Sequence, residues 1–262
     1  MRTEGLRAAF AFFTRLPVGR PDAPGTDQGA GFQGAAGWLP VVGLVVGCLA
    51  GAVTAVAGHF LPPFACGVIG CFAWTALTGG LHLDGVADCG DGLWVEAGTQ
   101  RRLEIMRDAR LGTFGGAALF FALALKAAAL AALAGLAAQA GHGAVSALNL
   151  LTACACSGLF ARTAVFVLMR RPSARPGGLG AALRAGVGRR EEIRAMLFTA
   201  AACGAGLTLG PAGLLAPAAV LCLTFRLART VERRLGGVTG DVFGCLVESA
   251  ECVALLAFAA QW

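Results

Sequence analysis

Long apolar runs separated by short charged segments constrain this chain more than any other feature of its sequence. A helix needs about 20 apolar residues to cross the hydrocarbon core of a membrane, and five runs approach that length. A sixth run, Ala195–Phe225, is longer than one span and contains Pro211 and Pro217, so it predicts two helices that join near Pro211. The five single runs are Trp38–Phe60, Pro63–Leu81, Gly112–Ala138, Ala144–Met169 and Val242–Gln261.

The composition supports a membrane protein. Hydrophobic residues make up 57% of the 262 residues and charged residues 14%, whereas about 25% of the residues of a soluble domain are charged. We therefore expect an all-α, polytopic integral membrane bundle with seven spans, six or eight being the alternatives. No linker divides the chain, so residues 1–262 form one predicted domain. Gly43, Gly47 and Gly51 are spaced by four residues, which predicts close packing against another helix.

The distribution of charged residues predicts the orientation of the chain. Outside the expected spans they fall in four segments, and with seven spans all four lie on one side of the membrane. The positive-inside rule places that side, and the N-terminus with it, in the cytoplasm. The net charge of +6 thus reflects topology, and no nucleic-acid partner is expected. The segments are Met1–Asp27, Asp84–Arg110, Arg170–Arg194 and Arg226–Asp241.

Two parts of these segments carry expectations of their own. Leu6–Phe13 predicts an amphipathic helix that lies at the membrane interface. Arg171–Gly188, RPSARPGGLGAALRAGVG, is rich in glycine, proline and arginine and predicts a flexible loop.

Three carboxylates gather in the segment Thr78–Leu93, TGGLHLDGVADCGDGL. Asp84, Asp88 and Asp91 are spaced by four and three residues, which places them on one face of a helix. Because like charges on one face repel each other, a divalent cation such as Mg²⁺, Mn²⁺ or Ca²⁺ is the expected partner. A carboxylate-bound cation at a membrane surface favours chemistry on a phosphate-bearing substrate. His82 is interpreted as a general base, a residue that orients a metal ligand, or an interfacial histidine.

The second charged cluster lies in Arg101–Thr113, RRLEIMRDARLGT, where we expect a helix just before the Gly112 span. Two interpretations remain open. In the first, this is a solvated surface helix whose charges pair and help to set the topology. In the second, Asp108 joins the metal site, while Arg107 and Arg110 bind phosphates with their planar guanidinium groups.

The third cluster is the glycine-rich segment Gly236–Gly244, GGVTGDVFG. Glycines let the backbone approach a phosphate closely, and Thr239 offers a hydroxyl group. Asp241 is a candidate ligand for a second cation. The alternative is a turn into the last span with Asp241 as the N-cap of the helix.

Four charged residues fall inside the expected spans, namely Lys126, Arg162, Glu248 and Glu251. Because a charge in the bilayer is costly, each of them should face the bundle interior or a polar cavity. We expect ion pairs between the two cations and the two carboxylates. Direct contact between Lys126 or Arg162 and a substrate is the alternative.

Over essentially its whole length the chain resembles the cobalamin synthase family, the adenosylcobinamide-GDP ribazoletransferases, also called cobalamin 5′-phosphate synthases. Four segments carry the resemblance, and the middle two are long and highly specific for a membrane protein. Arg162 and Glu248 also fall where the family carries such residues. The segments are Phe13–Pro17 (FTRLP), Thr78–Leu93, Arg102–Gly116 (RLEIMRDARLGTFGG) and Gly236–Gly244.

The resemblance implies a reaction. In this family a ribose hydroxyl of α-ribazole, or of its 5′-phosphate, attacks the phosphorus attached to the cobinamide side chain of adenosylcobinamide-GDP, and GMP leaves. These enzymes depend on Mg²⁺ and sit in the bacterial inner membrane, which implies a multi-pass protein with its active face in the cytoplasm. The expected partners are the two substrates and membrane lipid. A homo-oligomer or a complex with other enzymes of cobalamin assembly is a further hypothesis.

The motifs and the resemblance together predict three overlapping groups of site residues. The predicted catalytic residues are His82, Asp84, Asp88 and Asp241. The predicted metal ligands are Asp84, Asp88, Asp91, Asp108 and Asp241. The predicted substrate-binding residues are Arg107, Arg110, Lys126, Arg162 and Thr239.

Two other classes of function remain open. Charged residues inside the spans suit a transporter for a corrinoid or a metal, although the carboxylates lie at the membrane edge rather than at the midplane, where transporter sites tend to lie. The stretch Asp88-x-x-Asp91-Gly92 is similar to the opening of the CDP-alcohol phosphotransferase signature. The rest of that signature is absent from this sequence.

Overall fold

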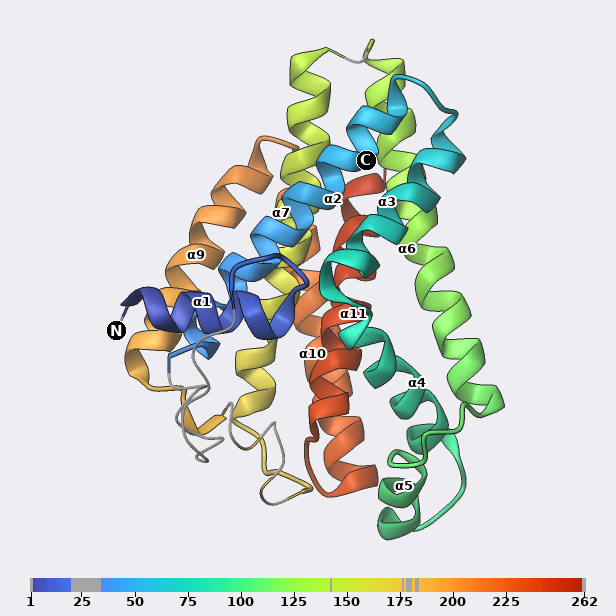
Figure 1. Cartoon of the computed structure of the whole chain (residues 1–262), viewed down its shortest axis with the longest axis vertical. Helices are drawn as coiled ribbons and strands as arrows, with labels where there is room; N and C mark the ends of the chain where they lie inside the picture. Colours follow the sequence, from blue (N-terminus) through green and yellow to red (C-terminus); the bar gives the residue numbers. More distant parts are fainter. Residues whose placement is uncertain are drawn as a thin grey trace.

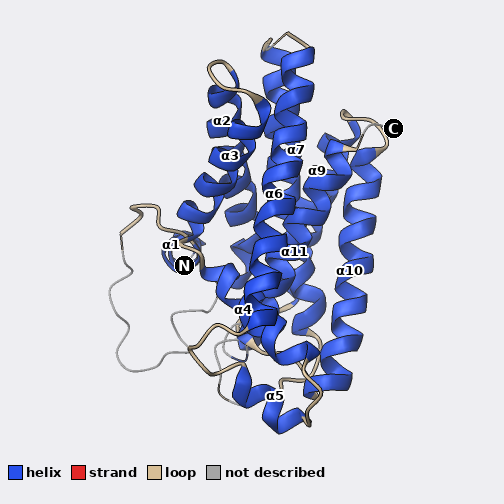
Figure 2. Ribbon diagram, turned by 90° about the vertical axis from the view of Figure 1, so that its right-hand side faces the viewer, coloured by secondary structure: helices blue, strands red, loops and turns tan. Residues whose placement is uncertain are grey.

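The computed structural model of the chain is a bundle of α-helices (Figure 1 and Figure 2). It describes residues 2–19, 34–141, 143–175, 177, 181 and 184–260, and these residues form helices and no strand. The fold class is therefore the expected one. The helices are α1 (Arg2–Phe13), α2 (Leu39–Gly58), α3 (Pro63–Thr78), α4 (Leu81–Trp94), α5 (Thr99–Ile105), α6 (Thr113–Gln139), α7 (Ala144–Met169), α9 (Arg189–Leu207), α10 (Ala212–Leu235) and α11 (Gly240–Ala259).

Five helices in the described part of the chain are long and apolar enough to cross a membrane, and the bent pair α3–α4 would make six. The remaining expected span corresponds to α9, whose first turns carry several charged residues, among them Glu191 and Glu192. The expected break near Pro211 is confirmed, because α9 ends at Leu207 and α10 begins at Ala212. The five spans are Ala36–Gly58, Thr113–Gln139, Ala144–Met169, Ala212–Leu235 and Gly240–Ala259.

The expected run Pro63–Leu81 does not form one straight helix. It bends by 97° between α3 and α4, at Gly79 and Gly80, whose φ angles are +65° and +71°. Residues with a Cβ rarely adopt this left-handed conformation, so the glycine pair ends one helix and starts the next. The bend gives the carboxylates a helix of their own, which packs between α6 and α11.

The predicted close packing of α2 is confirmed. Gly43 lies against the backbone of Gly158, and Gly47 lies against the backbone of Cys154, both on α7. A Cβ atom at either position would overlap the α7 backbone. Small residues thus let the two helix backbones approach, as they do in other membrane bundles.

The connections between helices separate by charge. The apolar α2–α3, α6–α7 and α9–α10 connections lie at one end of the bundle, while α5, the C-terminal end of α10 and the segment after α7 lie at the other (Figure 1 and Figure 2). Helix α1 lies across the bundle beside the start of α2 (Figure 1). The described parts of the charged segments that follow α4, α7 and α10 therefore share one end, which is what the charge pattern predicted.

Candidate active site

A cavity of about 340 Å³ opens among α1, α4, α7 and α11. Its wall contains five of the residues that the sequence assigned to a site, which come from three separate segments. On the side of α1 and α2 the wall is apolar, with Phe13 and Leu39. The five predicted residues are His82, Asp84, Arg162, Thr239 and Asp241.

The carboxylates of α4 and α11 approach each other because the two helices are in close contact. Gly85 lies against the backbone carbonyl of Asp241, where a Cβ atom would overlap that carbonyl. The neighbouring Asp84 is exposed and lines the cavity with Asp241. The half-buried Asp88 does not line the cavity but interacts electrostatically with both of them. Three predicted catalytic carboxylates therefore lie in one region.

Asp241 sits in the first turn of α11, but Thr239 is the N-cap. The Thr239 hydroxyl accepts a hydrogen bond from the Val242 amide at 3.4 Å and donates one to Asp241 Oδ2 at 3.2 Å. The alternative in which Asp241 caps the helix is therefore wrong. The Asp241 carboxylate instead faces the cavity, near the positive end of the helix dipole.

Arg175 is a cavity residue that sequence analysis missed. Its Nη1 donates to Asp241 Oδ2 at 2.9 Å, and its Nη2 donates to the Leu103 carbonyl at 3.2 Å. The residues before it pair with the glycine-rich segment, because Ala174 N donates to Val238 O at 3.0 Å and Val238 N donates to Pro172 O at 2.8 Å. Residues 176, 178–180 and 182–183 of the predicted flexible loop lie outside the described residues. Arg175 lies in the segment RPSARPGG. The composition of this segment is typical of a loop and does not indicate a site.

Asp91 has a different environment from the other carboxylates of α4. Its Oδ2 accepts from Gly112 N at 2.7 Å, and its Oδ1 accepts from Gly115 N at 2.8 Å. These amides belong to the N-terminal end of α6, which otherwise leaves its first amides without acceptors. Asp91 thus caps α6 from a neighbouring helix and does not line the cavity.

Only the first part of the second charged cluster forms the expected helix, because α5 ends at Ile105, before Arg107. Arg107, Asp108 and Arg110 are exposed and lie outside the cavity. Asp108 accepts hydrogen bonds from the Arg110 guanidinium at 2.6 and 3.0 Å, which lower the pKa of Asp108 to about 2. The geometry fits the surface interpretation, in which these charges pair with each other.

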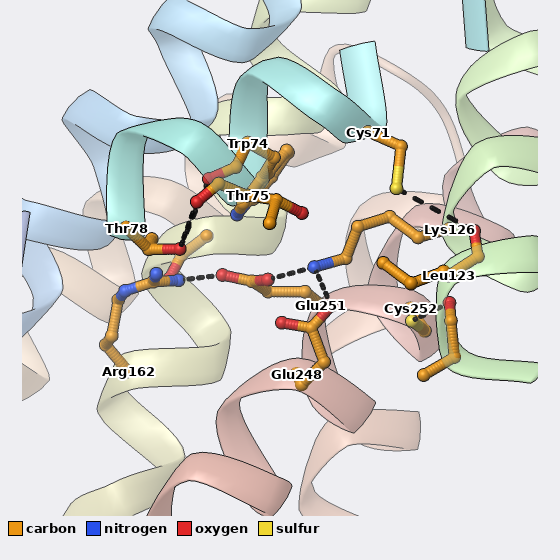
Figure 3. Close-up of polar contacts among 12 residues, drawn as sticks. Cys71, Trp74, Thr75, Thr78, Leu123, Lys126, Arg162, Glu248, Glu251 and Cys252 are labelled. Carbon is orange, nitrogen blue, oxygen red and sulfur yellow. Dashed lines mark hydrogen bonds and ion pairs between the residues drawn. The ribbon is translucent and has the colours of Figure 1, made fainter. Parts of the chain in front are cut away.

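The four charged residues inside the spans form one buried network, and the predicted ion pairs are confirmed (Figure 3). Lys126 of α6 pairs with Glu248 and, at 2.6 Å, with Glu251 Oε2 of α11. Arg162 of α7 pairs with the other oxygen of Glu251. Lys126 is buried away from the cavity, whereas Arg162 lines it.

The donor set suits a hard divalent cation that arrives with a substrate. No three His, Cys, Asp or Glu side chains in the described part of the chain gather into one metal-binding group. Mg²⁺, however, usually takes only one or two protein carboxylates and completes its shell with water and substrate phosphate oxygens. Asp84 and Asp241, with Asp88 beside them, provide such oxygens in the cavity wall.

Fold and site together define a multi-pass helical membrane protein with a cavity that carries both carboxylates and arginines. A family model described as cobalamin-5-phosphate synthase matches residues 5–259. The chain belongs to this family.

Curated relatives agree with the family model. Adenosylcobinamide-GDP ribazoletransferase of Roseiflexus sp. (strain RS-1) is 39% identical over 248 residues, which cover 94% of this chain and 86% of the relative. The proteins of the same name from Klebsiella pneumoniae (strain 342) and Escherichia coli (strain K12) are 37% and 35% identical, and each alignment covers 95% of this chain and 97% of the relative. No solved structure matches the chain significantly.

Proposed function

We propose that this protein transfers the adenosylcobinamide phosphate group of adenosylcobinamide-GDP to α-ribazole or to α-ribazole 5′-phosphate, with release of GMP. Membership of the family and the shared name of the relatives support the reaction. The cavity is the observation that supports the location of the reaction, because Asp84 of α4, Arg162 of α7 and Asp241 of α11 all line it.

The reaction makes two demands on the protein. A ribose hydroxyl oxygen forms a new bond to phosphorus while the bond from that phosphorus to the GMP oxygen breaks, so the hydroxyl proton needs an acceptor and the leaving phosphate gains charge. His82 and Asp84 line the cavity and are the proposed proton acceptors. The guanidinium group of Arg175 contacts the Asp241 carboxylate. From this position it would also stabilise negative charge on the leaving phosphate.

Mg²⁺ is the proposed cofactor. Asp84 and Asp241 would hold it, with the Asp88 side chain close to both. When bound, such a cation neutralises charge on the transferring and leaving phosphoryl oxygens. Without a cation the same carboxylates repel the diphosphate, so activity should depend on divalent metal.

We also propose the bacterial inner membrane as the location, with the cavity reached from the cytoplasm. The described charged connections cluster at the end of the bundle that carries α5 (Figure 1), and basic connections are retained in the cytoplasm. The substrates are soluble and cytoplasmic in this account.

Mass spectrometry of the product tests the proposal. Purified protein in detergent is mixed with adenosylcobinamide-GDP and α-ribazole 5′-phosphate, with Mg²⁺ or with a chelator. We expect GMP and a corrinoid whose mass includes the ribazole phosphate, and only in the presence of Mg²⁺. Uptake of a corrinoid into liposomes without any new product would favour a transporter instead.

A further inference from the structure

The inner wall of the cavity carries buried polar atoms that have no partner among the described residues. They are Nε and Nη2 of Arg162 and Nε2 of His82. Both side chains line the cavity, and only 1% of Arg162 and 6% of His82 is exposed. Buried polar groups in folded proteins are nearly always hydrogen-bonded, so these atoms require an explanation.

The free atoms of Arg162 form one edge of its planar guanidinium group. The other terminal nitrogen, Nη1, is engaged by Glu251 and by the Gly158 carbonyl, which it contacts at 3.2 Å. An edge with two parallel N–H donors matches two oxygens of one phosphate or carboxylate. The anchored side of Arg162 thus leaves its anion-binding edge without a partner, in a side chain that lines the cavity.

Glu251 holds this arrangement in place. One of its oxygens pairs with Arg162, and the other accepts from Lys126 Nζ at 2.6 Å (Figure 3). Lys126 also pairs with Glu248, so two cations and two carboxylates balance in the buried network. Glu251 therefore acts as a positioning residue that fixes the orientation of Arg162.

The two parts of the cavity attract different groups. Asp84 and Asp241 carry negative charge and bind a phosphate only through a cation. Arg162 carries positive charge and needs no cation, so it offers a place where a phosphate can bind independently of the metal.

We propose that Arg162 forms a metal-independent subsite for the 5′-phosphate of the α-ribazole acceptor. This inference rests on the proposed function, in which two phosphate-bearing molecules meet in one cavity. A corrinoid ring with its side chains is too large for a cavity of about 340 Å³, since pockets of this size hold ordinary small molecules. The donor therefore extends only its diphosphate into the cavity, and the inner wall is left to the smaller acceptor.

The test compares two acceptors that differ only in that phosphate. Steady-state kcat/KM is measured with α-ribazole and with α-ribazole 5′-phosphate at saturating adenosylcobinamide-GDP and Mg²⁺. The charge-balanced double variant R162Q/E251Q removes the subsite and leaves the Lys126–Glu248 pair intact. We expect the preference for the phosphorylated acceptor to fall on the order of 10- to 100-fold, mainly through KM, which is typical for the loss of a charged hydrogen-bonded contact.

Two control variants accompany it. The double variant K126M/E248Q removes the half of the network that does not line the cavity, and it should keep the acceptor preference even if the protein becomes less stable. Arg170→Gln, at an exposed ion pair with Glu192, controls for a general change in surface charge and should leave both acceptors unaffected.

A further variant of the subsite covers the case in which R162Q/E251Q does not fold. Arg162→Lys keeps the charge beside Glu251 but lacks the two-pronged edge, so the preference should fall and KM for the phosphorylated acceptor should rise. An unchanged acceptor preference in the folded variants, or an equal loss with both acceptors, would overturn the subsite. A wild-type protein that forms no product from either acceptor would refute the proposed function rather than this assignment.

Discussion

At the residue scale, the three carboxylates of α4 have different environments although they share one helix face. Asp84 is exposed in the cavity wall, and Asp88 is half-buried beside Asp241. Asp91 uses both oxygens to accept from the first amides of α6. A shared face therefore does not make the three residues equivalent, and substitutions should separate them.

Asp91 gives the clearest separation. Asp91→Ala should destabilise the protein by about 1 kcal/mol, because α6 loses its cap, whereas the single amide oxygen of Asn can still accept one of the two hydrogen bonds. Asp91→Asn should therefore be more stable than Asp91→Ala and stay within a few-fold of wild type in turnover. Thermal unfolding in detergent and product formation at limiting Mg²⁺ measure the two effects. Complete loss of turnover in a stable Asp91→Asn protein would show instead that Asp91 binds the cation.

The sequence locates some site residues and misses others for a physical reason. His82, Asp84 and Asp241 lie in polar motifs that interrupt apolar runs, and all three reach the cavity. Arg175 could not be found this way, because its role depends on backbone hydrogen bonds between residues 172–174 and Val238. Asp108 lies outside the cavity, since closeness in sequence to Asp91 does not bring its side chain there.

At the scale of helices, the bend between α3 and α4 and the contact between α2 and α7 position the site. The bend directs α4 against α11, where Gly85 allows the approach to Asp241. On the opposite side of the cavity, Gly43 of α2 makes room for both the Gly158 carbonyl and the Arg162 side chain. The glycines thus set the distance between the helices that carry the carboxylates and arginines.

Gly43→Ala tests this packing. Its Cβ would overlap the α7 backbone and the Arg162 side chain, and overpacking of this kind typically costs about 1–3 kcal/mol. We expect a lower unfolding temperature and reduced product formation. Gly204→Ala is the matched control, because nothing lies within 4 Å of its Cβ position, and in a helix interior it should be stabilising by about 0.5–1 kcal/mol. Equal stability of the two variants would contradict the packing account.

Helix bounds followed from the sequence more closely than helix directions did. The run Ala144–Met169 coincides with α7, since apolar length is what a membrane selects. The 97° bend was missed because Gly79 and Gly80 lie next to apolar residues and leave no gap in hydrophobicity. Only the backbone conformation of the two glycines reveals it.

At the scale of the whole molecule, charge separates the two ends of the bundle. The connections near α5 carry charged residues, while the α6–α7 connection at the other end is apolar (Figure 1). This asymmetry predicts that the charged end of the bundle faces the cytoplasm and the apolar end faces the opposite side of the membrane.

Cysteine labelling in spheroplasts measures the orientation. In a variant without the native cysteines, Ala144→Cys should react with an impermeant maleimide in intact spheroplasts, because Ala144 is exposed at the apolar end. Gln100→Cys, exposed in α5, should react only after the membrane is permeabilised. The reverse pattern would invert the topology and place the cavity on the wrong side for cytoplasmic substrates.

The central claim is that the cavity between α4 and α11 is where the phosphoryl transfer occurs. Its most direct test measures product formation by mass spectrometry in Asp84→Asn, Asp241→Asn and the control Asp108→Asn. The account predicts losses on the order of 100-fold for the two cavity variants. Asp108→Asn should retain activity close to wild type, because Asp108 is exposed outside the cavity and pairs with Arg110. Near wild-type turnover of both cavity variants, with normal dependence on Mg²⁺, would contradict the account.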